Sequence, residues 1–86
     1  MTSTELLQST DLQKIADEGS AIYASIKANY GPECLGKFLA IDIDSEDVFL
    51  ADTSAEAVVK ALKLHPGKVF YVVKIGFDAA VTLAHL

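Results

Sequence analysis

The chain has 86 residues, of which 51% are hydrophobic, and it carries a formal net charge of −5 with a mean hydropathy of +0.33. Its seven basic residues are all lysines scattered along the sequence, which excludes a basic stripe for nucleic acid and disfavours anionic membrane surfaces. A chain this short forms one domain with a modest core, so the large apolar share favours an oligomer or a bound partner.

The N-terminal residues and the cysteine content bear on the compartment. Residues 1–8 are expected to form a flexible tail or a first helical turn. They have neither the basic start of a signal peptide nor a membrane-spanning apolar run. Cys34 is the only cysteine, which excludes an internal disulfide and a metal cluster built on cysteines. We therefore expect a cytoplasmic protein.

Residues 9–30 are predicted to form a long helix. Ser9-Thr10-Asp11 offers an N-cap and Gly31-Pro32 terminates the helix. One face collects residues at spacings of three and four, namely Leu12, Ile15, Gly19, Ile22, Tyr23, Ile26 and Tyr30. A glycine in mid-helix costs about 1 kcal/mol relative to alanine. Gly19 therefore indicates either a kink or the close approach of another backbone, and we favour close packing.

A β-β-α-β block is predicted over residues 36–76. The stretch 37–43 alternates between an apolar face that should meet a helix (Leu39, Ile41 and Ile43) and a second face of Phe38, Ala40 and Asp42. The four polar residues 44–47 indicate a hairpin turn, and residues 48–51 form a short return strand.

A second helix should follow the hairpin. Thr53 and Glu56 fit a capping box, and the apolar residues that recur at helical spacing are Ala55, Val58, Val59 and Leu62. Pro66-Gly67 ends this helix, and residues 69–75 form a third strand rich in β-branched and aromatic residues.

These elements predict an α+β fold of the type α-β-β-α-β, in one domain. A small antiparallel sheet of strand order 2-1-3 packs against two helices, with the first strand at its centre. The segment 77–86 fits both an edge strand and one face of a helix. We favour an extended segment, which would add a fourth edge element to the sheet.

Carboxylates are concentrated around the predicted hairpin turn. A calcium loop of the EF-hand type starting at Asp42 would need glycine at Asp47 and glutamate at Thr53, so that motif fails. Asp42 and Asp44 could pair as acid and base, but a solvated hairpin tip supplies neither a pocket nor unequal environments. We expect no metal, cofactor or catalytic site here.

The cysteine and the aromatic residues have simpler roles. Cys34 would need His65 or His85 as a base to act as a nucleophile, and a structural, half-buried cysteine is the favoured interpretation. His65 falls at a helix C-terminus, where a cation is favoured. Tyr23, Tyr30 and Tyr71 lie in apolar stripes, and Tyr71 is the strongest candidate for an interface anchor.

Four segments carry a resemblance to a known family: GKFLAID, DVFLADTSAEAVVKAL, HPGKVFYVVKIG and the following FDAA. Over roughly residues 36–80 the chain resembles small uncharacterised bacterial proteins with a similar strand, capped helix, turn and final "FYVVRIG" strand. Lys74 stands where those proteins have arginine. The resemblance implies a cytosolic protein with an accessory or antitoxin-like role, and it identifies no catalytic residue.

The predicted function is therefore binding of another chain, without enzymatic activity. We expect a homodimer that also binds a partner protein, through interface residues Tyr71, Val73, Ile75, Phe77, Val81 and Leu83. The alternative, from a different class, is a regulatory subunit that binds a small molecule or an ion.

Overall fold

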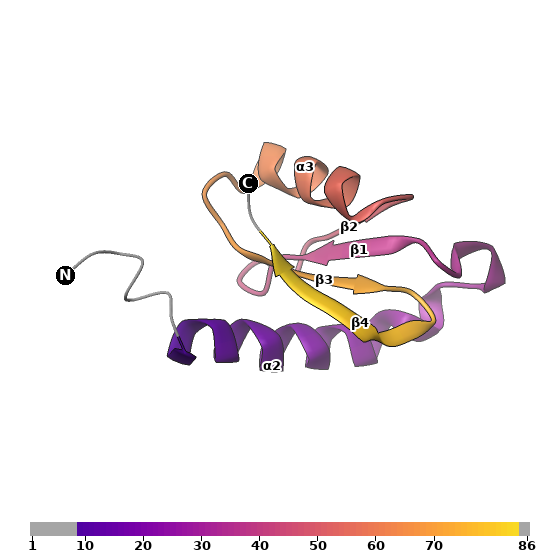
Figure 1. Ribbon diagram of the computed structural model, residues 1–86, viewed down its shortest axis with the longest axis horizontal. Helices are drawn as coiled ribbons and strands as arrows, with labels where there is room; N and C mark the ends of the chain where they lie inside the picture. Colours follow the sequence, from indigo (N-terminus) through magenta and orange to yellow (C-terminus); the bar gives the residue numbers. More distant parts are fainter. Residues whose placement is uncertain (1–8, 85–86) are drawn as a thin grey trace.

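The computed structural model describes residues 9–84, apart from the side chains of residues 9–11, 78–81 and 84. The elements in chain order are helix α2 (Ser9–Ile26), strands β1 (Phe38–Ile41) and β2 (Val48–Ala51), helix α3 (Ser54–Leu64), and strands β3 (Phe70–Lys74) and β4 (Phe77–Ala84). Two 3-10 turns, Lys27–Asn29 and Pro32–Cys34, connect α2 to β1. In Figure 1 the sheet lies between the two helices.

The four strands form one antiparallel sheet in the order β2-β1-β3-β4. This confirms the predicted α+β class, the order 2-1-3 and the extended fourth element, β4. In the central strand, Ile41 lies opposite Val48 on one side and Tyr71 on the other. The strands predicted over 37–43 and 69–75 are each shorter in the structure, where they span Phe38–Ile41 and Phe70–Lys74.

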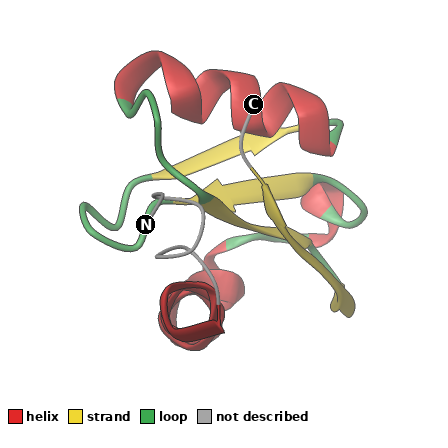
Figure 2. Cartoon of the chain, turned by 60° about the vertical axis from the view of Figure 1, so that its left-hand side comes forward, coloured by secondary structure: helices red, strands yellow, loops and turns green. Residues whose placement is uncertain are grey.

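The two helices cover opposite faces of the sheet, as Figure 2 shows with α2 seen end-on. Because side chains alternate along a strand, Leu39 and Ile41 of β1 join the α2 side, whereas Ala40 joins the α3 side. The α2 core also holds Tyr71 and Val73 from β3. The protein therefore has two apolar cores separated by one sheet.

Helix α2 ends earlier than the sequence predicts. Its α-helical geometry stops at Ile26, the turn Lys27–Asn29 continues as 3-10 helix, and Tyr30 is already extended. The shorter helix still buries Tyr23 and packs Ile15 and Ile22 against the core. Neither helix of residues 9–84 is long and apolar enough to cross a membrane.

Helix α3 confirms the predicted cap and half of the predicted apolar stripe, since Val58 is buried and Leu62 packs against the core. Ala55 and Val59 of that stripe are exposed. The Thr53 hydroxyl oxygen accepts a hydrogen bond from the Glu56 backbone N–H at 3.1 Å. The buried residues are Ala57, Val58 and Ala61, while Val59 is 42% exposed. Alanines on this face meet Ala40 and Ala51 of the sheet, so the helix can approach the strands closely.

Candidate functional site

Strand β4 lies at the edge of the sheet, and it is the feature most suited to contact another molecule. It has eight residues, its register with β3 shifts between Val73 and Lys74, and within residues 9–84 it pairs with β3 alone. Its backbone groups on the other side therefore make no ladder hydrogen bonds to described residues. An unpaired edge of this length can accept a strand from another polypeptide.

The opposite edge of the sheet is less suited to strand pairing. Strand β2 has only four residues, and the Lys60 ammonium donates a hydrogen bond to the Leu50 carbonyl at 2.7 Å. Lys37 and Asp52 form an ion pair near the same end. Short strands and lysines are both common protections against edge-to-edge association. The two edges thus differ in what they offer a partner.

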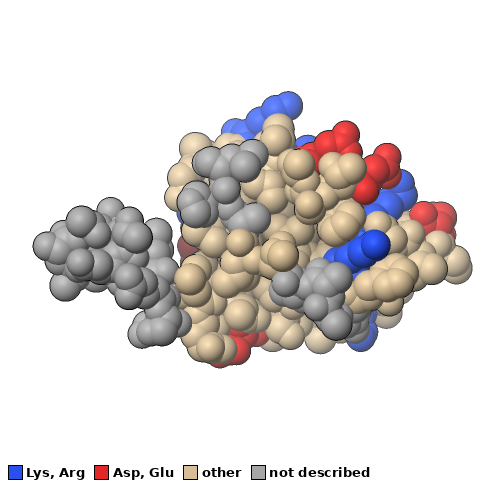
Figure 3. All heavy atoms as spheres, in the orientation of Figure 1, with Lys and Arg blue, Asp and Glu red and all other residues tan. Residues whose placement is uncertain are grey.

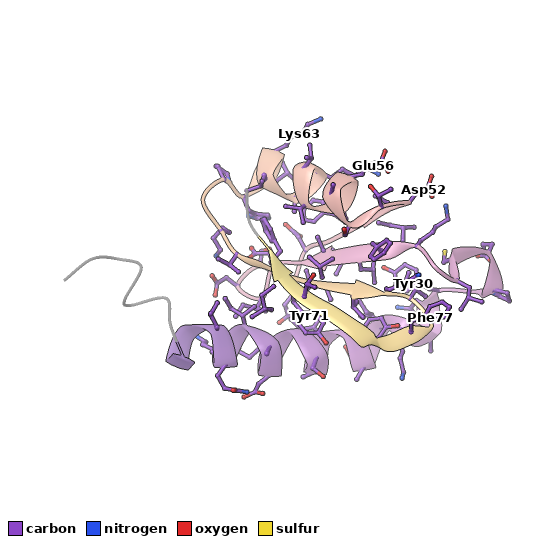
Figure 4. All side chains as sticks on the ribbon, in the orientation of Figure 1. Tyr30, Asp52, Glu56, Lys63, Tyr71 and Phe77 are labelled. Atoms are coloured by element: carbon purple, nitrogen blue, oxygen red, sulfur yellow. The ribbon has the colours of Figure 1, made fainter. Side chains whose placement is uncertain are left out.

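Three of the six predicted interface residues lie inside the protein. Tyr71, Val73 and Ile75 are each at most 5% exposed, and they belong to the core under α2. Figure 4 shows Tyr71 between the sheet and α2. Strand β3 is an inner strand, so these side chains shape the edge only by holding β4 in place.

The other three predicted interface residues belong to β4 itself. Phe77 is 49% exposed at the start of the strand, and Leu83 packs partly against the α2 core. Val81 lies opposite Val73 in the ladder, and its side chain is outside the described part of the chain. Among the side chains that the structure describes, Phe77 is therefore the aromatic residue that β4 exposes to solvent.

On the face of the molecule that carries β4, the described side chains between α3 and α2 are mainly uncharged (Figure 3). Figure 3 shows charged side chains gathered near the N-terminus of α3, and mostly uncharged atoms among those coloured between there and α2. Lys74 is an exception at one end, where its ammonium lies 4.7 Å from the centre of the Phe77 ring.

The β1–β2 turn holds a second group of polar residues, and here the expectation of a solvated tip was wrong for Asp42. Asp42 is 1% exposed, whereas Asp44 and Asp47 lie on the surface. The Asp42 N–H donates to the Asp47 carbonyl at 3.0 Å, and the Glu46 N–H donates to the Asp42 carbonyl at 2.7 Å. This tight turn places the Asp42 side chain between the sheet and the end of α3.

Three side chains surround the buried Asp42 carboxylate. The Ser45 hydroxyl donates to Oδ2 at 2.8 Å, His65 Nδ1 lies 3.5 Å from Oδ2, and Lys68 Nζ lies 3.4 Å from Oδ1. The contact with Lys68 is an ion pair, and Oδ1 makes no hydrogen bond to a described residue. Lys68 also pairs with Asp44. These contacts connect the β1–β2 turn to the end of α3 and to the residues that precede β3.

The electrostatics keep this carboxylate charged. Burial acts to raise the pKa of the Asp42 carboxyl, but the hydrogen bond from Ser45 and the charges of Lys68 and His65 outweigh it, and the pKa lies below its usual range. The hydrogen bond with Asp44 raises the pKa of Lys68. At neutral pH the cluster is therefore an ion-pair network with both signs of charge.

Ser45, His65 and Asp42 resemble a catalytic triad in composition but differ from one in geometry. The Ser45 hydroxyl lies 3.4 Å from His65 Nε2, yet its proton is directed to Asp42. His65 Nε2 is closer to Asp47 Oδ2, at 2.8 Å. A triad needs the serine proton to be donated to the imidazole, whereas Ser45 donates its proton to Asp42 and His65 Nε2 faces Asp47. We infer a structural role for the cluster.

Cys34 is a free thiol buried against Tyr23 and Leu39 in the α2 core. Burial, and then the neighbouring thiol, raises the pKa of Tyr30. His85, the other proposed partner of Cys34, lies outside the described residues. Within the described part of the chain, no three His, Cys, Asp or Glu side chains are placed to hold one metal ion.

No family model, no curated protein and no solved structure matches this chain. The resemblance to small bacterial proteins therefore stays a prediction.

Proposed function

We propose that this chain is a non-enzymatic protein-interaction module that associates through the edge of β4. A strand from another polypeptide adds to this edge and extends the four-stranded sheet. The observation that carries the proposal is the contrast between the two edges, one long and unpaired within residues 9–84 and one short and bound by Lys60. Strand addition supplies main-chain hydrogen bonds together with alternate side-chain contacts.

The simplest partner is a second copy of the chain, related by a two-fold axis. The high apolar content of so short a chain supports a dimer, because one small core hides only part of that surface. In an accessory or antitoxin-like role in the cytoplasm, the same edge would bind a strand of another protein in place of the second copy.

Light scattering coupled to size exclusion tests the dimer across a hundredfold dilution series. Thr82 is exposed on β4, so Thr82→Lys would bring like charges together at a two-fold edge and should shift the mass toward the monomer. Ala24→Lys, on the exposed face of α2, is the matched control and should leave the mass unchanged. A wild-type chain that remains a monomer at every concentration would refute self-association.

A second candidate function rests on a cavity beside the turn cluster. A space of about 300 Å³ lies between α2 and the loop before β3, with Ile15, Ile43 and Val69 as apolar walls and Lys14 and Lys68 at its sides. Such a space suits a small molecule with an apolar body and an acidic group. A melting screen against small carboxylates tests this role, and a melting temperature unchanged across the panel would contradict it.

A further inference from the structure

A groove at the C-terminal end of α2, called here the α2 groove, shares no lining residue with the cavity beside the turn cluster. Its walls come from the end of α2, the connection between α2 and β1, and the turn between β3 and β4. Its volume of about 450 Å³ lies within the range of about 300–1,000 Å³ that is typical of small-molecule sites. Figure 4 shows Tyr30 of this groove at the same end of the molecule as Phe77.

Aromatic and aliphatic side chains form the apolar part of the α2 groove. Tyr23, Tyr30, Leu35 and Ile75 all line it. Leu35 is 62% exposed, and it lies against Gly76, where an added Cβ atom would overlap the leucine side chain. A ligand that covers Leu35 removes this apolar surface from water, which favours binding. A flat aromatic body suits such a groove, because it can meet the tyrosine rings in stacked or edge-to-face contact.

The polar groups that the groove offers are hydrogen-bond donors. Lys27 supplies an ammonium, which lies 5.9 Å from the centre of the Tyr23 ring. The Gly76 N–H donates to the Tyr23 hydroxyl oxygen at 3.5 Å, which is longer than the usual range of about 2.7–3.2 Å. Burial raises the pKa of Tyr30, so its hydroxyl keeps its proton at neutral pH. Each of these groups can donate to an anion.

The backbone acceptors of the same groove already have donors. The carbonyls of Lys27, Gly31 and Pro32 accept backbone hydrogen bonds in the connection between α2 and β1, at 3.0–3.2 Å. The Ile75 carbonyl accepts another at 2.9 Å. Among the described residues that line the groove, Lys27 is the only charged one, and the Glu33 carboxylate lies near Gly31 but outside the lining. The groove is therefore suited to an anion rather than to an amine.

We propose that the α2 groove binds a small aromatic carboxylate. The carboxylate pairs with the Lys27 ammonium in a charge-assisted hydrogen bond, and the aromatic body lies over Leu35 between the tyrosine rings. An amine of the same shape would bring a second positive charge to Lys27 and is rejected. This site is independent of association through β4, so it does not depend on the proposed dimer.

Three matched probes test the class of ligand by NMR titration of the ¹⁵N-labelled chain. 3-Phenylpropionate carries the ring and the charge, 3-phenylpropionamide keeps the ring alone, and propionate keeps the charge alone. The dissociation constant of 3-phenylpropionate should be lower than those of the other two by about tenfold or more. Its shift changes should include the amides of Leu35 and Gly76. Equal constants for the acid and the amide, or no shift changes with any probe, would overturn the proposal.

Substitutions then test the roles of the lining residues. Lys27→Gln should raise the dissociation constant of 3-phenylpropionate about tenfold and leave that of the amide unchanged, whereas Lys27→Arg should retain most of the affinity. Leu35→Ser should weaken the acid and the amide alike. Both residues are exposed, and thermal unfolding without ligand checks that their variants fold. Lys27→Gln with wild-type affinity for the acid would refute the site.

Lys14→Gln is the matched control, because Lys14 lines the cavity beside the turn cluster and not the α2 groove. It should leave the affinity for 3-phenylpropionate unchanged. Shift changes at Lys14 and Val69 in place of Leu35 and Gly76 would assign the ligand to that other cavity. Such a result would overturn this inference while supporting the second candidate function.

Discussion

Gly19 of α2 lies directly against the ring of Tyr71 in β3. A Cβ atom added at Gly19 would come within 2.3 Å of Tyr71 Cγ, so helix and strand approach more closely than any other residue would permit. The predicted close packing at Gly19 is thereby confirmed, with the difference that the neighbour is an aromatic ring rather than a backbone.

Gly19→Ala should destabilise the protein although alanine favours helix. The gain in helix propensity is about 1 kcal/mol, whereas forcing a methyl group into a filled core costs about 1–3 kcal/mol. Because the overlap is severe and involves the rigid base of a ring, we expect the free energy of unfolding to fall by about 1–2 kcal/mol. Urea unfolding measures it. Ser20→Ala, on the exposed side of α2, should be neutral or stabilising, and a more stable Gly19→Ala variant would contradict the packing.

Ile41→Ala should be among the most damaging single changes. Ile41 is fully buried in the central strand, in the core beneath α2. Truncation leaves a cavity and should lower the free energy of unfolding by about 2–5 kcal/mol, which is much of what a small domain has. Val59→Ala removes an exposed side chain and should cost far less in the same melting experiment. A melting temperature for Ile41→Ala within a degree or two of wild type would be inconsistent with the central position of β1.

Asp42→Asn should reduce stability and change its dependence on pH. Replacing the buried carboxylate weakens the contacts with Ser45, His65 and Lys68, at a cost of about 1.5–3 kcal/mol at neutral pH. Since the pKa of Asp42 is lowered in the folded state, its stabilisation is present above the unfolded value of about 3.9 and disappears as the pH falls through the folded value. In unfolding curves recorded between pH 7 and 3, the difference in stability between wild type and variant should hold from pH 7 down to about 4 and narrow as the pH falls below the unfolded pKa. A constant gap between the curves at all pH values would speak against an ionised Asp42.

Thr53→Ala should remove the N-cap of α3. Its hydroxyl accepts from the Glu56 N–H and donates to the Glu56 carboxylate at 3.1 Å. Loss of such a cap costs about 0.5–2 kcal/mol. Thr53→Ser keeps the hydroxyl and should retain most of that stability in chemical denaturation. Equal losses in the two variants would show that the methyl group, and not the cap, matters.

Local patterns in the sequence predict most of the backbone. Alternation in residues 38–41, the Thr53 cap and the stop at Pro66-Gly67 each depend on a few neighbouring residues, and the structure confirms them. Given these elements, connection rules leave little choice of strand order. The extended conformation of β4 could be predicted in the same way, because β-branched residues follow a glycine turn.

The positions of side chains in three dimensions were harder to predict. Asp42 was assigned to a solvated tip because its sequence neighbours are polar, but His65 and Lys68, which surround it, come from a distant part of the chain. On α3, hydrophobicity favoured Val59 over Ala57, yet the small alanine is buried because the helix lies close to the sheet. Tyr71 was taken for a surface anchor, but it is buried because α2 approaches β3 closely at Gly19, more than fifty residues earlier in the sequence.

The placement of α2 beneath β3 has a consequence for synthesis on the ribosome. The apolar face of this helix leaves the ribosome first, but Tyr71 and Val73, the residues that cover it, are translated only after the hairpin and α3. At roughly 5–20 residues per second, the helix spends seconds without its packing partner. A nascent chain stalled before Phe70 should therefore expose a binding surface for chaperones along Ile15, Ile22 and Tyr23, which the completed chain withdraws.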